Sequence, residues 1–274
     1  MKSENNTLDL SIVMPALNEE ANIAGAIEHT LEAFFRYGLN GEIIVVNDGS
    51  TDETARIAEE IAAREGGSRI RMIHHRTPQG LGAAFRDGLA EAEGEAVAFM
   101  PGDDENDPGE IVRYYGLLGQ VDMVVPFVYN KDVRPKLRNL ISTVFRMIVN
   151  ITFGVNFNYT NGTVLYRRAI LASSPNRSSG FFFQTENVVR AVWSGYLFAE
   201  VPYRLAVRSG GESKAISLRS LRQVMGDYLA LVKEIYFSPA KKAGRKPAPG
   251  TVSDRRRRET IEIGLGKPGK YSRE

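Results

Sequence analysis

The stretch EIIVVNDGSTD, residues 42–52, decides the fold class. Its first six residues form a nearly continuous apolar run, which is typical of a parallel strand covered on both faces. The glycine that follows lets the chain turn sharply, and Ser50 or Thr51 can then cap a helix over 52–64. A buried strand that leads directly into a helix is the repeating unit of a parallel α/β sheet.

The same unit recurs on both sides of this stretch. Strands are predicted over 9–15, 69–75, 95–100 and 121–127, and helices over 19–37, 80–91 and 108–118, with Asn18 as the N-cap of the first. This alternation predicts an α/β fold with a Rossmann-like, mostly parallel sheet flanked by helices. In such sheets the ligand binds beyond the carboxyl ends of the strands, which here carry PALNE, NDGSTD, HHRTPQGLG and PGDDEND.

The second half of the chain is less regular. An apolar helix interrupted by arginines is predicted over 135–153, a strand over 163–166, a helix over 184–193, a strand over 197–208 and an amphipathic helix over 217–237. From residue 238 onward the chain is rich in Pro, Gly and basic residues, so we expect a disordered tail over 238–274.

Composition excludes several kinds of site. The 274 residues include no cysteine, which excludes a disulfide scaffold, a thiolate metal site and a cysteine nucleophile. Of 35 Lys and Arg and 33 Asp and Glu, 11 and 4 lie after residue 237. This leaves 24 and 29 in residues 1–237, a net charge of −5, against +7 in the tail. A basic tail fits nucleic acid, an anionic membrane or no specific partner.

No stretch approaches the ~18 consecutive apolar residues that a membrane helix needs. The first ten residues, MKSENNTLDL, lack the apolar core of a signal peptide. We therefore expect a cytoplasmic protein that could also lie at the inner face of the membrane. The sequence predicts no oligomeric state.

The most informative motif is MPGDDENDPGE, residues 100–110. It places Asp103, Asp104, Glu105 and Asp107 directly after a predicted buried strand. Clustered carboxylates repel one another unless a cation or many hydrogen-bond donors neutralise them. Mg²⁺ and Mn²⁺ prefer carboxylate oxygens, and Mg²⁺ is commonly held by one or two carboxylates plus substrate phosphates. The alternative is a solvated acidic turn that caps the following helix.

Three weaker motifs lie nearby in the predicted fold. Asp48, at a strand end, can accept hydrogen bonds from a ribose or a base, although a simple turn would also explain it. The glycines of TPQGLGA, residues 77–83, allow close approach of the backbone to a ligand. Arg208 and Lys214, in RLAVRSGGESK, could bind phosphate or form an ordinary basic loop. Together these motifs favour a phosphate-rich ligand.

With these motifs in this order, the chain resembles family 2 glycosyltransferases, whose fold is called GT-A. The segments that carry the resemblance are PALNEEANI (15–23), VVNDGSTDET (45–54), QGLGAAFRDGL (79–89), PGDDENDP (101–108) and EVPYRLAVRSGGESK (200–214). Within the family it is most similar to dolichyl-phosphate mannose synthases and related polyprenyl-phosphate sugar transferases. The resemblance thus implies a GT-A domain over 1–237, with a nucleotide-binding half (1–127) and an acceptor half (128–237).

The resemblance implies a role for each matching residue. The nucleotide would be bound by Pro15, Leu17, Glu19, Val46, Asp48, Gly80, Gly82, Asp103, Arg208, Ser213 and Lys214. Asp103 and Glu105 would hold Mg²⁺ or Mn²⁺. Pro101 replaces the first acid of the family's metal motif, and Asp104 is a candidate substitute for it.

The implied reaction is inverting transfer of a hexose from a nucleoside diphosphate sugar, either GDP-mannose or a UDP-sugar. The expected acceptor is a polyprenyl phosphate at the membrane surface, with Arg134, Arg138, Arg146 and Asn161 as candidate contacts. The cation held by Asp103, together with Arg208 and Lys214, would stabilise the charge on the departing diphosphate. An acceptor hydroxyl would need a base, for which Glu186 is the candidate. A non-catalytic nucleotide-sugar-binding module is the remaining alternative, and a nucleic-acid partner is not expected.

Overall fold

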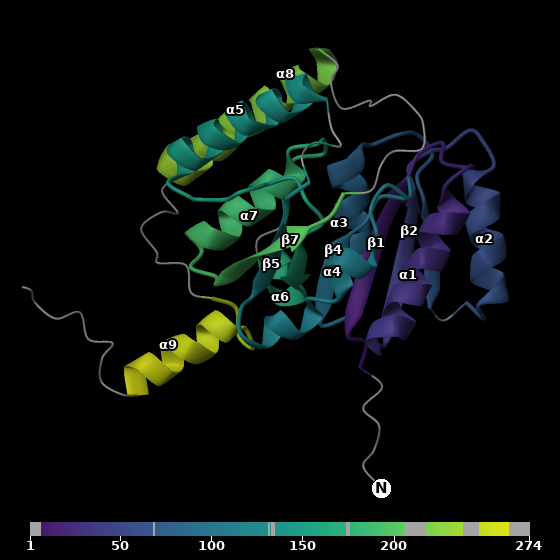
Figure 1. Ribbon diagram of the computed structural model, residues 1–274, viewed down its shortest axis with the longest axis horizontal. Helices are drawn as coiled ribbons and strands as arrows, with labels where there is room; N and C mark the ends of the chain where they lie inside the picture. Colours follow the sequence, from purple (N-terminus) through teal and green to yellow (C-terminus); the bar gives the residue numbers. More distant parts are fainter. Residues whose placement is uncertain are drawn as a thin grey trace, which may run out of the picture.

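The computed structural model describes residues 7–67, 69–130, 132, 135–173, 176–205, 218–237 and 247–262. These residues contain a seven-stranded sheet in the order β3-β2-β1-β4-β6-β5-β7 (Figure 1). The strands are β1 (Leu10–Ala16), β2 (Gly41–Asn47), β3 (Ile70–His74), β4 (Ala96–Phe99), β5 (Met123–Val128), β6 (Leu165–Arg167) and β7 (Phe198–Tyr203). Only β6 among them pairs antiparallel with its neighbours, so the predicted mostly parallel sheet is confirmed.

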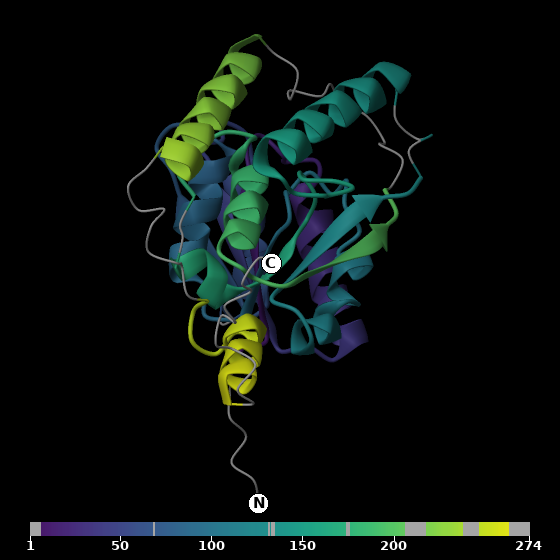
Figure 2. The ribbon, with the colours of Figure 1, turned by 90° about the vertical axis from the view of Figure 1, so that its left-hand side faces the viewer.

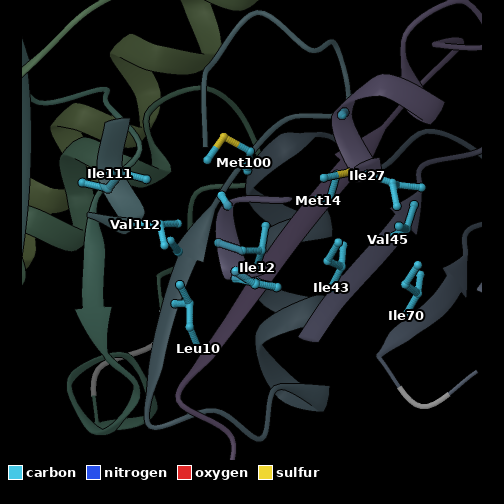
Figure 3. Packing of buried hydrophobic residues seen from close by; sticks show 14 of the residues in the cluster. Leu10, Ile12, Met14, Ile27, Ile43, Val45, Ile70, Met100, Ile111 and Val112 are labelled. Carbon is cyan, nitrogen blue, oxygen red and sulfur yellow. The ribbon is translucent and has the colours of Figure 1, made fainter. Parts of the chain in front are cut away.

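Helices cover both faces of the sheet. One face carries α1 (Ile23–Tyr37), α2 (Thr54–Arg64), α4 (Gly109–Val112) and the short 3-10 helix η1 (Tyr115–Gly119); the other carries α3 (Leu81–Glu91), α6 (Arg168–Ser173) and α7 (Phe183–Trp193). Alternate residues of each strand enter opposite layers. In β1, for example, Ile12 and Met14 pack against α1 (Figure 3), whereas Val13 packs under α3. The double burial explains the continuous apolar run of β2.

Two longer helices, α5 (Lys136–Phe153) and α8 (Leu218–Phe237), form a further layer over α7 at one end of the molecule (Figures 1 and 2). Val149 and Phe153 of α5 pack with Leu231 and Ile235 of α8 and with aromatic Phe182 beside α7. None of the described helices is both long enough and apolar enough to cross a bilayer.

The start of the first helix differs from the prediction. Residues 17–22 form a loop, and α1 begins at Ile23, after Asn22. Asn18 has a positive φ of 55°, donates its N–H to Ser50 Oγ and accepts the N–H of Thr51. These bonds join the loop after β1 to the loop after β2, so Asn18 cannot cap a helix.

The prediction of a wholly disordered tail is wrong, because residues 252–262 form helix α9 (Val252–Glu262). Asp122, at the start of β5, is fully buried and accepts the backbone N–H groups of Val252 (2.6 Å) and Ser253 (3.1 Å). A buried carboxylate thus caps the helix N-terminus. The helix lies at the end of the molecule opposite α5 and α8 (Figure 1).

Candidate active site

A pocket of about 580 Å³ opens at the carboxyl end of the parallel strands. Its floor comes from the strand ends, with Phe99, Val128 and Tyr203, and its opposite wall comes from α5 and α8. Glu105 and Asn106 supply polar atoms on one side and Arg138 a cation from α5. The rest of the lining is largely apolar and aromatic, and it includes Leu81, Ile141, Phe145, Phe181, Phe182, Phe183, Leu205, Leu221 and Val224.

The acidic loop, residues 101–108, borders this pocket. It is tied to the body at several points. Gly102 donates its N–H to the carbonyl of Pro15 (3.0 Å). Tyr203 donates its hydroxyl to Asn106 Oδ1 (2.9 Å), and burial raises the pKa of this tyrosine, so the hydroxyl keeps its proton. Asp103 Oδ1 accepts the N–H of Glu105 (3.2 Å).

The side chain of Asp104 is not among those that line this pocket, and it contacts α1 instead. Its Oδ1 lies 2.9 Å from Nδ1 of His29 on α1. The hydrogen bond with Asp104 raises the pKa of His29 above its ordinary value. In this arrangement the Asp104 carboxylate is bound to α1, whereas Asp103 and Glu105 remain the proposed metal ligands.

The carboxylates of the acidic loop fit a divalent cation that also binds the phosphates of a substrate. Within the described part of the chain, no group of three or more His, Cys, Asp or Glu residues is arranged to hold a metal ion. Asp103 and Glu105, both half-buried, supply carboxylate oxygens at the strand ends. Two carboxylates are too few for an all-protein cage, but they suit Mg²⁺ or Mn²⁺ that also binds substrate phosphates. The residues thus fit a metal that arrives with its nucleotide.

The carboxylate of Asp48 is bound by other groups of the protein. Its side chain is buried and lies 2.6 Å from Nδ1 of His75, whose Nε2 contacts Asp87 (3.0 Å). It also accepts the N–H groups of Gln79 (2.8 Å) and Gly80 (2.9 Å). The contact of this carboxylate with a ribose or base stays a prediction, because the partners that the structure shows are groups of the protein. Asp48 shapes the loop after β3.

The remaining nucleotide-binding candidates of the first strands differ in access. Pro15 and Val46 are buried, and the side chain of Val46 belongs to the core under α3. Leu17 and Glu19 are half-buried in the loop after β1, where Glu19 donates its N–H to Thr54 Oγ1 (2.7 Å). The two loop residues are therefore the more exposed of these four candidates.

Gly80 and Gly82 make room for a second chain segment, residues 176–180. A Cβ at Gly80, whose φ is +98°, would lie 2.6 Å from the carbonyl oxygen of Ser179. A Cβ at Gly82 would lie 2.3 Å from that of Ser178. Backbone atoms cannot move aside as a flexible side chain can. Both glycines are therefore required for packing, whether or not a ligand also approaches them.

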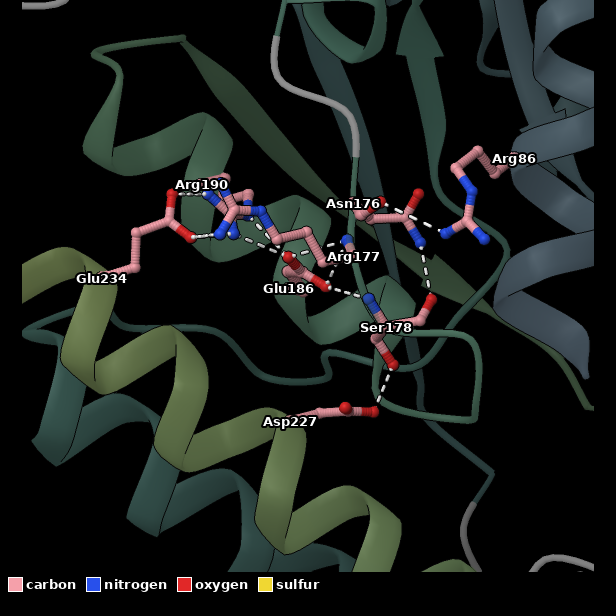
Figure 4. Close-up of polar contacts among 8 residues, drawn as sticks. All are labelled: Arg86, Asn176, Arg177, Ser178, Glu186, Arg190, Asp227 and Glu234. Atoms are coloured by element: carbon pink, nitrogen blue, oxygen red, sulfur yellow. Dashed lines mark hydrogen bonds and ion pairs between the residues drawn. The ribbon is translucent and has the colours of Figure 1, made fainter.

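Glu186 is held by other groups of the protein. Its side chain is 5% exposed and accepts the N–H groups of Arg177 and Ser178. Arg190 bridges it at 2.8 Å to Glu234 of α8 (Figure 4). These donors occupy the carboxylate and join α7 to α8. A role of Glu186 as general base stays a prediction, and the structure gives its carboxylate donors from segments that are distant in the sequence.

Some of the candidate acceptor contacts line the pocket and others do not. Arg138 and Asn161 line the pocket. Arg146 points to the carbonyl of Phe157 at 3.4 Å and is absent from the pocket wall. Arg134, Arg208, Ser213 and Lys214 lie outside the described residues.

Sequence reasoning missed three side chains that shape the site. His29 and Tyr203 anchor the acidic loop, and no local motif marks either of them. His75 lies between two carboxylates, those of Asp48 and Asp87. The sequence signal for His75 is the adjacent pair of histidines, His74 and His75, where β3 ends.

Comparison with known proteins identifies the family. The model of the family described as "Glycosyl transferase family 2" matches residues 11–183. The chain belongs to glycosyl transferase family 2. It is 30% identical over 232 residues to the polyprenol monophosphomannose synthase of Mycolicibacterium smegmatis, with 78% of this chain and 83% of the relative covered.

A second relative is the dodecaprenyl-phosphate galacturonate synthase of Rhizobium johnstonii, 31% identical over 168 residues. That match covers 60% of this chain, which spans about half (49%) of the relative's length. Among solved structures, glucosyl-3-phosphoglycerate synthase from Mycobacterium tuberculosis, in complex with Mn²⁺, UDP and phosphoglyceric acid, is similar at a TM-score of 0.59. The identity is 25%, and 82% of this chain and 78% of that one are covered. The expected GT-A fold is thereby confirmed.

Proposed function

We propose that this family 2 glycosyltransferase moves a hexose from a nucleoside diphosphate sugar to a polyprenyl phosphate, with inversion at the anomeric carbon. One observation carries the proposal. The pocket joins an acidic loop at the strand ends to a largely apolar wall formed by α5 and α8. A diphosphate with its cation suits the first part, and an isoprenoid chain suits the second.

The outer faces of α5 and α8 support a lipid acceptor. Large apolar side chains on both helices are exposed to 42–78%, namely Leu137, Leu140, Ile141, Val144, Met147, Ile148, Ile151, Leu221, Met225, Leu229 and Phe237. An apolar surface of this extent marks an interaction site, and a helix with one apolar face can lie in the membrane interface. We propose that this face rests on the membrane that carries the acceptor.

The pocket also offers a partner for the acceptor's phosphate. Arg138 of α5 enters the wall that lies under the exposed apolar face. A guanidinium can bind a phosphate through two parallel hydrogen bonds. The phosphate would thus lie between Arg138 and the sugar, with its isoprenoid chain along the phenylalanines.

A phosphate nucleophile removes the need for a base. It is already anionic at neutral pH, and the internal bonding of Glu186 therefore does not disable the enzyme. Transfer to a hydroxyl would need another carboxylate to take the proton. The burial of Glu186 thus favours the phosphate acceptor over the hydroxyl acceptor.

Asp103 and Glu105 would hold Mg²⁺ or Mn²⁺, which when bound neutralises the charge of the departing diphosphate. Arg208, Ser213 and Lys214 follow β7 in sequence and are proposed to contact the same diphosphate. The names of the two relatives, a phosphomannose and a galacturonate synthase, favour a hexose donor, and the solved neighbour contains UDP. GDP-mannose and UDP-sugars are therefore the first donors to test.

The test is transfer of labelled sugar into an organic-extractable lipid. Purified protein is mixed with Mn²⁺, a medium-length polyprenyl phosphate and either GDP-[¹⁴C]mannose or labelled UDP-hexoses. We expect lipid-linked label with one donor class, its loss with EDTA or Asp103→Asn, and a raised KM for the lipid in Arg138→Ala. Label that enters only water-soluble products would indicate a hydroxyl acceptor. Nucleotide binding with no transfer to any acceptor would indicate a binding module.

A further inference from the structure

The acidic loop is fastened to α1 by the residue that lies between the two proposed metal ligands. Asp104 has a φ of +54°, a left-handed conformation that non-glycine residues seldom adopt. Its Oδ1 contacts His29 Nδ1 at 2.9 Å. Asp and Asn tolerate this conformation better than most side chains, but it remains strained, and surrounding contacts must offset the strain.

A glycine on α1 makes the approach possible. A Cβ added to Gly25 would lie 2.7 Å from Asp104 Oδ2 and 3.8 Å from the ring of His29. Gly25 and His29 are one helical turn apart and so share a face of α1. Glycine in a helix interior is destabilising relative to alanine. The structure gives that glycine a specific use, which is to admit the carboxylate of Asp104.

The geometry couples this attachment to Asp103 and Glu105. These residues flank Asp104, so the backbone angles at Asp104 set the directions of both neighbouring side chains. Asp103 Oδ1 also accepts the N–H of Glu105, which closes the turn across Asp104. If Asp104 were released, its backbone could relax to negative φ and the two carboxylates would turn relative to each other.

We propose that His29 and Gly25 are positioning residues for the nucleotide-bound cation. They hold Asp104 in its left-handed conformation, and Asp104 in turn fixes the relative directions of Glu105, which lines the pocket, and of its neighbour Asp103, without binding the cation itself. The inference rests on the proposed function for its consequence in catalysis. The attachment itself is a property of the protein without ligands.

The first arm of the test contains no metal and no nucleotide. Hydrogen exchange at the amide of Glu105 is compared in the wild type, His29→Ala and His29→Asn. An asparagine amide can donate to Asp104 as the imidazole does, so exchange should be several-fold faster in H29A and restored in H29N. Equal protection in all three proteins would overturn the proposal, even if sugar transfer is established.

The second arm measures the affinity for Mn²⁺ in the presence of UDP or GDP by electron paramagnetic resonance. We expect roughly tenfold weaker binding in H29A and Gly25→Ala, which is the usual effect of losing a residue that orients a metal ligand. Gly226→Ala is the matched control, since a Cβ there meets no atom within 4 Å. Asp104→Asn should retain binding, whereas D103N should lose it. Complete loss in D104N with normal binding in H29A would make Asp104 a ligand and overturn the proposal.

If wild-type protein binds no Mn²⁺ with either nucleotide, the proposed function loses its metal site. The exchange comparison still decides whether His29 holds the loop. The failure of one hypothesis is therefore distinguishable from the failure of the other. G25A also serves as a check on folding, because alanine favours the helix and any loss of affinity must come from the displaced carboxylate.

Discussion

Asp122 should decide whether α9 is attached to the body. In the native protein it accepts the N–H groups of Val252 and Ser253, and Leu197 N–H lies 3.3 Å away. In Asp122→Ala, a docked α9 would bury two amides without acceptors, at about 1–3 kcal/mol each. Detachment would instead expose the side chain of Val252, which costs about 1.5–3 kcal/mol. Detachment is the cheaper route, so we expect α9 to undock with a loss of about 1.5–3 kcal/mol in unfolding free energy.

The assay combines urea unfolding with hydrogen exchange at the amides of Val252 and Ser253. In D122A we expect both amides to exchange at rates close to those of an unfolded chain, while the strands of the sheet stay protected. Glu259→Ala, which removes an exposed carboxylate from α9, is the matched control and should change neither measurement. Protected amides in D122A, with unfolding free energy unchanged, would refute the assignment of Asp122 as the anchor.

Other contacts give equally definite outcomes. Gly82→Ala should lower the unfolding free energy by about 1–3 kcal/mol in urea, because its Cβ meets a backbone carbonyl; Gly116→Ala, with open space, should not. Glu186→Gln should lower Tm but leave kcat of the folded enzyme within about twofold. A decrease in kcat of about 10²-fold would instead indicate that Glu186 acts as a base. Ile151→Glu, at a side chain 78% exposed, should weaken sedimentation with anionic vesicles about tenfold without lowering Tm; unchanged sedimentation would contradict the docking face.

The sequence was sufficient for the sheet because its signals are local. The apolar run of β2 and the alternation of strand and helix place five strands within two residues of their observed limits. The prediction of a ligand site at the strand ends is supported by the pocket beside Glu105. Hydrophobic periodicity depends on neighbours in the chain, which a single sequence contains.

The remaining features depend on contacts between distant residues. Helix α9 has no apolar face of its own, and its start is fixed by Asp122, 130 residues away. In the sequence, Glu186 resembles a catalytic acid. In the folded protein its carboxylate accepts hydrogen bonds from the amides of Arg177 and Ser178 and from the guanidinium of Arg190. Asp48 is similarly occupied by His75 and by two amides. Which carboxylates stay available to a ligand is thus decided by tertiary structure.

The most direct test of the central claim is the relaxation of ³¹P nuclei in a bound nucleoside diphosphate. Mn²⁺ held by Asp103 and Glu105 against the diphosphate should strongly accelerate relaxation of both phosphorus nuclei when wild-type protein is present. The double variant Asp103→Asn, Glu105→Gln should abolish the effect of the protein while leaving its fold intact. Equal acceleration by the double variant would contradict the claim that these two carboxylates bind the cation.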